Sequence, residues 1–337
     1  MQKINNNANL MRFIASLMVL WGHGYALNDT RKKEPIYRII NTIFDIPYVT
    51  GIHGLAVIFF FILSGYLITK SYVTHNDVKS FILFRVGRIY PGLYVNLGFS
   101  LLLALFITSL DIKEFLLNKQ VYTYVTTNLL MLKSTAFILP GIFEDNPFHG
   151  VNGSLWTIRY ELYCYVAIAF LGFIGVLSKK LLANIIYVSI FLFVILVFNS
   201  KFEYIILSFL YGAFIFNNEM EIKRIGYLKL IAFSLVVIFI FNGNYAKLWF
   251  LSLVIIWIGL YAKPIMPAYK VDISYGVYLY AFPIQQLIVS FGYGKMNIIL
   301  QNFISIFIVI GLGYLSYRYI EMPANKFFRM IAKRVTK

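Results

Sequence analysis

The chain has 337 residues, of which 60% are hydrophobic and only 13% are charged. Soluble domains are about half apolar and about a quarter charged, and a single soluble core stops growing near roughly 250–300 residues, so this composition disfavours a soluble enzyme, a disordered chain and a nucleic-acid-binding domain. The formal net charge of +16 comes from 30 Lys+Arg against 14 Asp+Glu. In a membrane protein, this excess of basic residues raises the question of whether they lie on one side of the membrane.

The first apolar stretch, from about Leu10 to Leu27, resembles a secretion signal only superficially. Arg12 interrupts it, and no small-x-small cleavage pattern follows, so we predict a retained membrane helix. Further along the chain, 28–50 is polar enough to be a loop, and 121–139 is apolar but rich in Thr and Asn, which predicts an interfacial or re-entrant piece. A spanning helix needs roughly 20 mostly apolar residues, and this length predicts ten spans: 9–27, 51–70, 91–110, 154–177, 181–198, 203–217, 226–242, 246–262, 272–292 and 297–318.

Ten spans place both termini on one side, and the basic residues indicate which side this is. With the N-terminus inside, 18 lysines and arginines fall on the inner side and ten on the outer side, while Arg12 and Arg159 lie within spans. The positive-inside rule therefore predicts cytoplasmic termini, although the cluster Arg31–Lys33 falls outside. We expect an all-α integral membrane protein, with 1–337 forming one domain and no soluble domain appended.

Two polar residues of the first span, Arg12 and His23, lie eleven residues apart. At 100° and 1.5 Å per residue they share a helix face and stand roughly 16 Å apart along the axis. An anionic ligand held by Arg12 could place its far end at the imidazole. The alternative is that Arg12 snorkels to headgroups while His23 sits at the outer interface.

Glu161 is the one acid that the sequence places well inside a predicted span. Ionisable groups in hydrocarbon are costly and are therefore functional candidates. This carboxylate could orient His23 or act as a base; the alternative is a structural ion pair with an arginine.

Cys164, the single cysteine, is expected to be a small core residue, and no histidine pair has the spacing of a zinc site. His53 lies at a loop edge and is expected to be structural or solvated.

Arg85 and Arg88 lie on the predicted inner loop before the third span. Three residues apart on a helical turn, they share a face and could grip a phosphate. The alternative is the ordinary positive-inside signal. Ser64 and Gly65 form a small pair inside a Phe-rich helix, where close helix packing is the simpler explanation.

Several segments together resemble the acyltransferase 3 family, which consists of bacterial multi-pass membrane O-acyltransferases. Each match is weak alone, but six of them occur in the right order along about 320 residues. The matching segments are Arg12 to His23 (R-x10-H), Phe59 to Leu67 (FF-x-x-SG), Arg85 to Pro91 (R-x-x-R-I-x-P), Ser154 to Glu161 (S-L-W-x-x-x-x-E), Ser274 to Tyr280, and Ile320 to Pro323.

The resemblance implies an acyl-CoA donor, most often acetyl-CoA, taken from the cytoplasm. It implies that His23 is the essential histidine with Arg12 as its partner, and that Arg85 and Arg88 are the cytoplasmic arginine pair. One departure concerns Ala281, because many members have a histidine at this place; a mechanism that needs this second histidine is in doubt here. We expect three further motif residues to contact substrate: Ser64, Trp156 and Tyr278.

The hypothesis that follows is transfer of an acyl group, which we expect to be acetyl, from acetyl-CoA or another acyl-CoA to a hydroxyl of a surface or lipid-linked saccharide, in the bacterial cytoplasmic membrane. His23, Glu161 and Arg12 are the predicted catalytic residues, while Arg85, Arg88 and Arg12 bind the donor. Neither a metal nor a nucleic acid is expected. The main alternative is a multi-pass transporter or flippase, which inverted repeats or Gly/Pro-broken helices in matching halves would favour; a non-catalytic acyl-CoA-binding membrane partner is a third.

Overall fold

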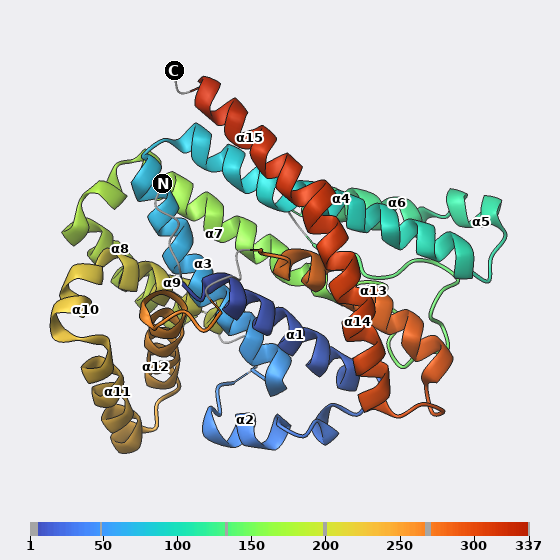
Figure 1. The fold of residues 1–337 in the computed structure, drawn as a ribbon, viewed down its shortest axis with the longest axis horizontal. Coiled ribbons are helices and arrows are strands. Elements are labelled where there is room, and N and C mark those ends of the chain that lie inside the picture. Colours follow the sequence, from blue (N-terminus) through green and yellow to red (C-terminus); the bar gives the residue numbers. More distant parts are fainter. Residues whose placement is uncertain (1–5, 48, 132–133, 198–200, 267–270, 336–337) are drawn as a thin grey trace.

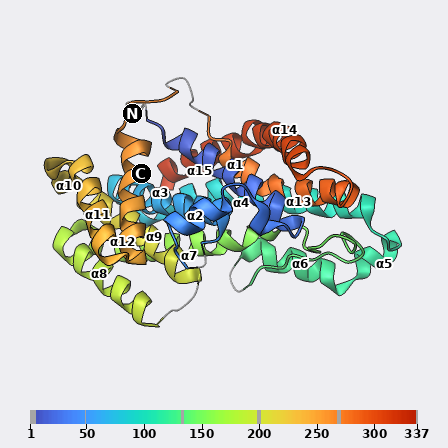
Figure 2. The same ribbon diagram turned by 90° about the horizontal axis from the view of Figure 1, so that it is seen from below.

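The fold was analysed in a computed structural model, which describes residues 6–47, 49–131, 134–197, 201–266 and 271–335. All regular structure in these ranges is helical. Figures 1 and 2 show α5 and α6 at one end of the molecule and α8, α10 and α11 at the other. The helices of the first half are α1 (Ala8–Leu27), α2 (Tyr37–Ile43), α3 (Gly51–His75), α4 (Val78–Ile107), α5 (Ile112–Leu117), α6 (Lys119–Leu130) and α7 (Trp156–Phe173).

The second half of the chain continues the same pattern. α12 and α14 each run on into a π-helical turn, so that α14 and α15 form one continuous helix. The helices are α8 (Lys180–Val197), α9 (Lys201–Asn217), α10 (Glu219–Ile225), α11 (Tyr227–Phe241), α12 (Asn244–Ile256), α13 (Ser274–Gly292), α14 (Ile298–Ser316) and α15 (Met322–Val335).

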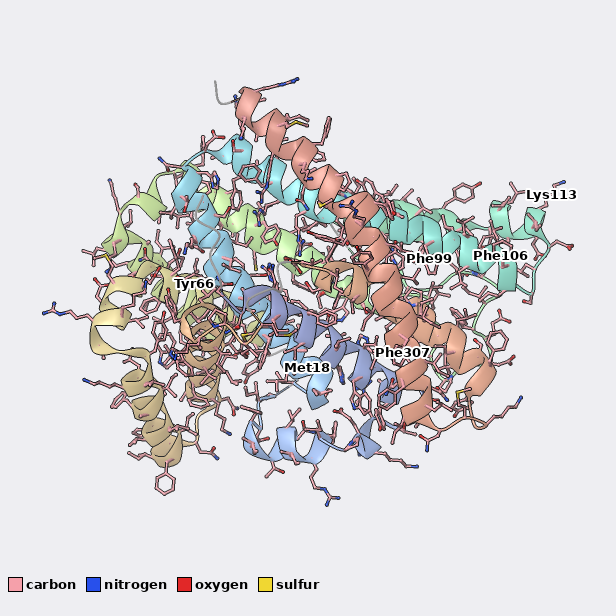
Figure 3. All side chains as sticks on the ribbon, viewed as in Figure 1. Met18, Tyr66, Phe99, Phe106, Lys113 and Phe307 are labelled. Carbon is pink, nitrogen blue, oxygen red and sulfur yellow. The ribbon has the colours of Figure 1, made fainter. Side chains whose placement is uncertain are left out.

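Six helices within the described ranges are long and apolar enough to cross a membrane. The pair α10 and α11, bent by 84°, would make a seventh. The outward surface fits a bilayer, since large apolar side chains such as Phe106 and Phe307 are 86% and 75% exposed (Figure 3). The protein is therefore a multi-pass membrane protein. The six helices are α1, α3, α4, α8, α12 with its extension to Tyr261, and the helix Ile298–Val335.

Close contact between α3 and α9 explains the small residues of the Phe-rich helix. A Cβ on Gly65 would lie 2.0 Å from the carbonyl oxygen of Phe209, and a Cβ on Gly212 would lie 2.1 Å from that of Ile62. Only glycine allows the two backbones to approach this closely in lipid. Gly65 is thus a packing residue, and the close contact that it allows between α3 and α9 positions its neighbour Ser64.

A buried non-helical segment precedes α7. Asn152 donates hydrogen bonds to Asn96 Oδ1 and to the Leu279 carbonyl, at 3.0 and 2.9 Å, and Gln286 donates to the Gly150 carbonyl at 2.6 Å. Irregular backbone is tolerated at membrane depth only where the protein itself satisfies its polar groups. The Gln286 side chain of α13 does this for the Gly150 carbonyl, and the hydrogen bonds of Asn152 hold the start of α7 against α4 and α13.

Two boundaries differ from expectation. Arg85 and Arg88 lie inside α4, which begins at Val78 and continues through Pro91, and not in a loop. The expected loop at 28–50 contains the short helix α2. Helix α4 starts early because Asp77 caps it, with its carboxylate accepting a hydrogen bond from the Ser80 amide at 2.6 Å.

Candidate functional site

A cavity of about 450 Å³ lies among α1, α3, α4, α7, α13 and the α14–α15 helix. This is within the usual range for a small-molecule site. Six of the eight predicted site residues line it, and His23 and Trp156 do not. The six are Arg12, Ser64, Arg85, Arg88, Glu161 and Tyr278.

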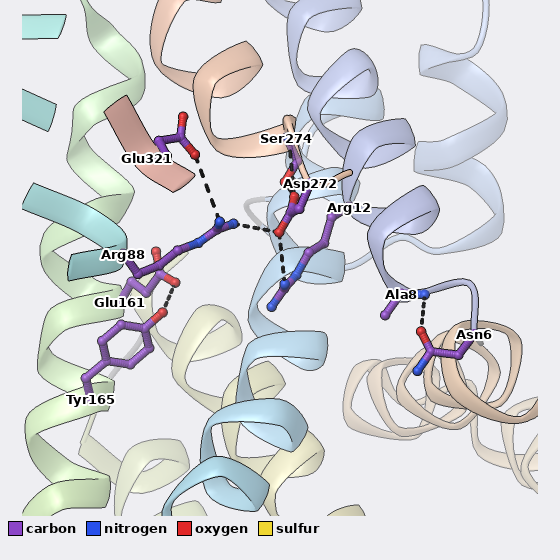
Figure 4. Close-up of polar contacts among 9 residues, drawn as sticks. All are labelled: Asn6, Ala8, Arg12, Arg88, Glu161, Tyr165, Asp272, Ser274 and Glu321. Carbon is purple, nitrogen blue, oxygen red and sulfur yellow. Dashed lines mark hydrogen bonds and ion pairs between the residues drawn. The ribbon is translucent and has the colours of Figure 1, made fainter. Parts of the chain in front are cut away.

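The polar centre of the cavity is a carboxylate shared by two arginines (Figure 4). Asp272 Oδ2 lies 2.8 Å from an Arg88 nitrogen and 3.4 Å from an Arg12 nitrogen. Its other oxygen accepts a hydrogen bond from the Ser274 hydroxyl at 2.5 Å. The Asp272 side chain is only 13% exposed, so it joins α1, α4 and the start of α13 in a partly desolvated network, where ion pairs are strong but costly to break.

A second acid reinforces Arg88 from the far end of the chain. Glu321 Oε2 lies 4.0 Å from the other terminal nitrogen of Arg88, and the Ser316 hydroxyl donates to Glu321 Oε1 at 3.0 Å. Acids other than Glu161 are therefore also buried within the helices. Glu321 is 1% exposed, and Glu203, on α9, is 4% exposed.

Arg85 differs from Arg88 in having no ion pair within the described ranges. Its guanidinium lies 5.6 Å from the ring centres of Phe81 and Tyr165, and one nitrogen is 3.5 Å from the Ser71 hydroxyl. Its Nε is buried without a hydrogen-bond partner among the described residues. The two arginines of the motif are thus not equivalent: Arg88 is neutralised by protein carboxylates, and Arg85 is available to an anion.

Glu161 lies beside the arginines rather than beside His23. The Tyr165 hydroxyl donates to its carboxylate, and both residues line the cavity. Because Tyr165 also faces the Arg85 guanidinium, Glu161 can fix the tyrosine against which Arg85 packs. The structure brings Glu161 together with Arg12, Arg85 and Arg88, and it places His23 elsewhere.

Tyr278 forms the deep wall of the cavity. Its hydroxyl donates to the Ser154 carbonyl at 2.7 Å and lies 2.6 Å from the Thr157 hydroxyl, which ties α13 to the start of α7. Beyond it, the Tyr278 ring packs with Ala15 of α1 and Ala56 of α3 in a small apolar cluster. Val19 belongs to the same cluster, so the cluster lies along α1 between Arg12 and His23.

His23 lies beyond that cluster, beside a second histidine. Its ring centre is 5.6 Å from that of His53 and 5.2 Å from that of Phe282, which is one helical turn past Tyr278. The Nδ1 atoms of both histidines are buried and have no hydrogen-bond partner within the described part of the chain. His53 is half-buried on α3, not in a solvated loop, and Gly22 leaves room for it, since a Cβ there would lie 2.6 Å from the His53 ring.

The connection after α1 adds a buried acid to the histidine end. Glu34 is 3% exposed, and its Oε2 accepts from the Ile52 amide at 3.5 Å. Burial raises the pKa of the Glu34 carboxyl above its ordinary value. Gly51, in the left-handed region with φ +65°, lies against both Glu34 and His53. The histidine end is therefore a cluster of polar side chains contributed by α1, α3 and their connection.

Two motif positions have packing roles. Trp156 starts α7 and packs on the rings of Tyr160 and Phe202, away from the cavity. Ala281, where the resemblance suggests a histidine, is 0% exposed in the main core.

Sequence analysis missed Asp272, Glu321 and His53. Asp272 could have been found as a short acid two residues before a helix-starting serine, and Glu321 lies in a motif that the resemblance had already identified. His53 gave no signal beyond its place near the start of a span. All three reach their partners across long separations in the chain, which a single sequence does not reveal.

Comparison with known proteins agrees with these features. A family model described as "Acyltransferase domain" matches residues 5–318. The "O-acetyl transferase" of Shigella phage Sf6 is 27% identical over 347 residues, covering 94% of this chain and 95% of that protein. "Nodulation protein 10" of Rhizobium leguminosarum bv. viciae is 30% identical over 176 residues, covering 49% of this chain and 44% of that protein. No solved structure gives a significant match.

Proposed function

The chain belongs to the acyltransferase 3 family and is a membrane O-acyltransferase, and we propose that it transfers an acetyl group from acetyl-CoA to a hydroxyl of a surface or lipid-linked saccharide. The family match favours this function over the transporter alternative. The name of the phage relative supports acetyl as the acyl group. The observation that carries the proposal is the arrangement along α1: cations gather around the cavity at its Arg12 end, and His23 lies beside a second imidazole at its other end.

The donor belongs at the cationic end. The cavity lining contains five cationic side chains and two acidic ones, a balance that suits the phosphates of CoA. Arg85 provides an unpaired guanidinium, while Asp272 and Glu321 hold Arg88 in place. The lining therefore fits a donor whose anionic part stays at the mouth and whose acyl end points inward, toward Tyr278.

The proposed topology puts this mouth at the cytoplasm. The six apolar spans, the bent pair α10–α11, and the helices α7, α9 and α13 together make ten. Each overlaps a range predicted from composition, and the lysine and arginine bias favours both termini inside. The mouth then opens to the bacterial cytoplasm, where acetyl-CoA is found, and the His23 end lies toward the outer face.

Transfer requires one proton acceptor and one proton donor. We assign both roles to His23, which removes the proton from the saccharide hydroxyl as its oxygen attacks the thioester carbon. The carbon–sulfur bond then breaks, and the imidazolium returns the proton to the departing thiolate. Phe60 and Phe282 line the route from Tyr278 to His23, so their side chains must rotate for the thioester to reach the ring. An acyl-His23 intermediate would use the same groups.

Arg12 and Glu161 support this reaction from the donor side. Arg12 lies on the same helix as His23 and faces the cavity, where its charge attracts the anionic donor. Glu161, held by Tyr165, balances the arginines and keeps Arg85 against its aromatic wall. Ser64, which lines the cavity on α3, contacts the donor's acyl arm in this proposal, as does Tyr278.

The test is esterification of a saccharide acceptor by the purified protein in lipid nanodiscs with acetyl-CoA. His23→Ala should lower kcat by about 10²–10⁴-fold, the usual contribution of a general base. His75→Ala is the matched control, because His75 is exposed at the end of α3 and should retain wild-type turnover. Equal turnover by wild type and His23→Ala would refute the assignment.

A further inference from the structure

The last helix, α15, lines the cavity although it lies beyond the residues matched by the family model, 5–318. Figure 1 shows α15 running beside the first half of α4. Its cavity residues follow the spacing i, i+3, i+4, i+7, which places them on one face of a helix. They are Met322, Asn325, Lys326 and Arg329.

Helix α15 is seated on α4 between the two arginines of the motif. A Cβ on Gly87 would lie 2.8–2.9 Å from three atoms of Phe328, a separation that real Cβ atoms essentially never show. Gly87 is therefore the residue that lets the Phe328 ring rest on α4 between Arg85 and Arg88. This contact fixes which face of α15 points to the cavity.

The cations that α15 brings have no carboxylate partner among the described residues. Lys326 and Arg329 are exposed at the rim. Arg329 is positioned by the ring of Phe84, 5.8 Å from its guanidinium carbon. Arg85, on the neighbouring helix, is unpaired in the same way, whereas Arg12 and Arg88 share Asp272.

We propose that α15 forms the phosphate-binding rim of the donor cavity, with Lys326 and Arg329 holding phosphate groups of the acyl-CoA together with Arg85. This rests on the proposed function, which supplies the donor. Guanidinium groups bind phosphate bidentately, and lysine binds it as a mobile point charge. The paired arginines deeper in the cavity then organise the site, while the three unpaired cations at its mouth recognise the anionic end of the donor. Anionic lipid headgroups offer the same phosphate chemistry, so the test must separate the two.

The experiment compares two donors in the full-length protein. Acetyl-CoA carries phosphates, and S-acetylpantetheine carries none. The double variant Lys326→Gln/Arg329→Gln should raise the KM for acetyl-CoA about tenfold or more, as expected for loss of charged hydrogen bonds, and leave the KM for S-acetylpantetheine unchanged. Lys333→Gln/Arg334→Gln removes the same charge from exposed positions of α15 that do not line the cavity, and it should change neither value.

Three outcomes would overturn the proposal: an unchanged KM for acetyl-CoA, an equal rise for both donors, or an equal effect of the control pair. Repeating the comparison in nanodiscs with only zwitterionic lipid separates the sources, because an effect that disappears there belongs to lipid headgroups and contradicts a donor site. Equilibrium binding of CoA distinguishes this proposal from the proposed function. If wild type binds CoA tenfold more tightly than the rim variant but forms no ester, the result supports phosphate binding by α15 and contradicts the proposed function.

Discussion

The two ends of α1 carry different chemistry. At Arg12 the helix faces a cavity with arginines from two helices, a shared carboxylate and a cationic rim. At His23 it faces a second imidazole and an aromatic ring, with unpartnered ring nitrogens among the described residues. Between the ends, Ala15 and Val19 pack against Tyr278 and Ala56. Under the proposed function, donor recognition and proton transfer are therefore separate tasks, carried by two side chains of one helix that stand about 16 Å apart along its axis.

The largest effect at the cationic end should come from Asp272→Asn. This change leaves Arg12 and Arg88 facing each other without their shared carboxylate, and breaking such a buried pair costs on the order of 3 kcal/mol. The unfolding midpoint of the purified protein in detergent should fall, and the KM for acetyl-CoA should rise. Asp111→Asn, at the exposed start of α5, is the control. Equal midpoints for wild type and Asp272→Asn would show that the network does not organise the cavity.

Arg85→Gln should separate binding from chemistry. Since Arg85 has no carboxylate partner within the described ranges, its loss should raise the KM for acetyl-CoA about tenfold while kcat and the unfolding midpoint stay near wild type. Arg38→Gln, exposed on α2, should change none of these values. A fall in kcat with an unchanged KM would instead place Arg85 in the chemical step.

At the histidine end, His53→Gln should lower kcat rather than raise the KM. The His53 ring packs against that of His23 and so restricts its orientation. We expect kcat to fall about tenfold, the effect of a misaligned rather than missing base, and the KM for acetyl-CoA to remain unchanged. His75→Gln serves as the control. A raised KM would mean that the anionic end of the donor reaches the two histidines, which would contradict the separation of donor binding from proton transfer.

The smallest effect concerns the pH dependence of stability. Because burial raises the pKa of folded Glu34, its contribution is favourable below the ordinary carboxyl pKa and is lost as pH rises through the raised value. Glu34→Gln should match wild type in thermal unfolding at pH 4 and unfold about 1–2 °C higher at pH 7. A lower unfolding temperature for the variant at pH 7 would show that the ionised carboxylate has a stabilising partner.

Local composition predicted much of the fold, because long apolar runs are a property of each helix alone. Arg12 and Glu161 were predicted as site residues because charges are costly in hydrocarbon. Arg85 was predicted because it shares a helix face with Arg88, and all three residues line the cavity. The resemblance to the acyltransferase 3 family is confirmed by the match over residues 5–318.

Other parts of the site depend on contacts that no local pattern shows. Asp272 meets Arg88 across 184 positions and Arg12 across 260, and before folding it resembles an ordinary helix cap. The cavity-facing residues of α15 become distinct from its other cations only once Phe328 is seated on Gly87. Tertiary packing, rather than helix propensity, decides which of the many cationic side chains form ion pairs.

The most direct measurement is CoA binding to purified His23→Ala, made beside its turnover assay. If the two ends of α1 have separate tasks, the variant should bind CoA with the wild-type Kd and form no ester above background. A Kd weakened as strongly as that of Arg85→Gln would contradict the separation, and so would wild-type ester formation.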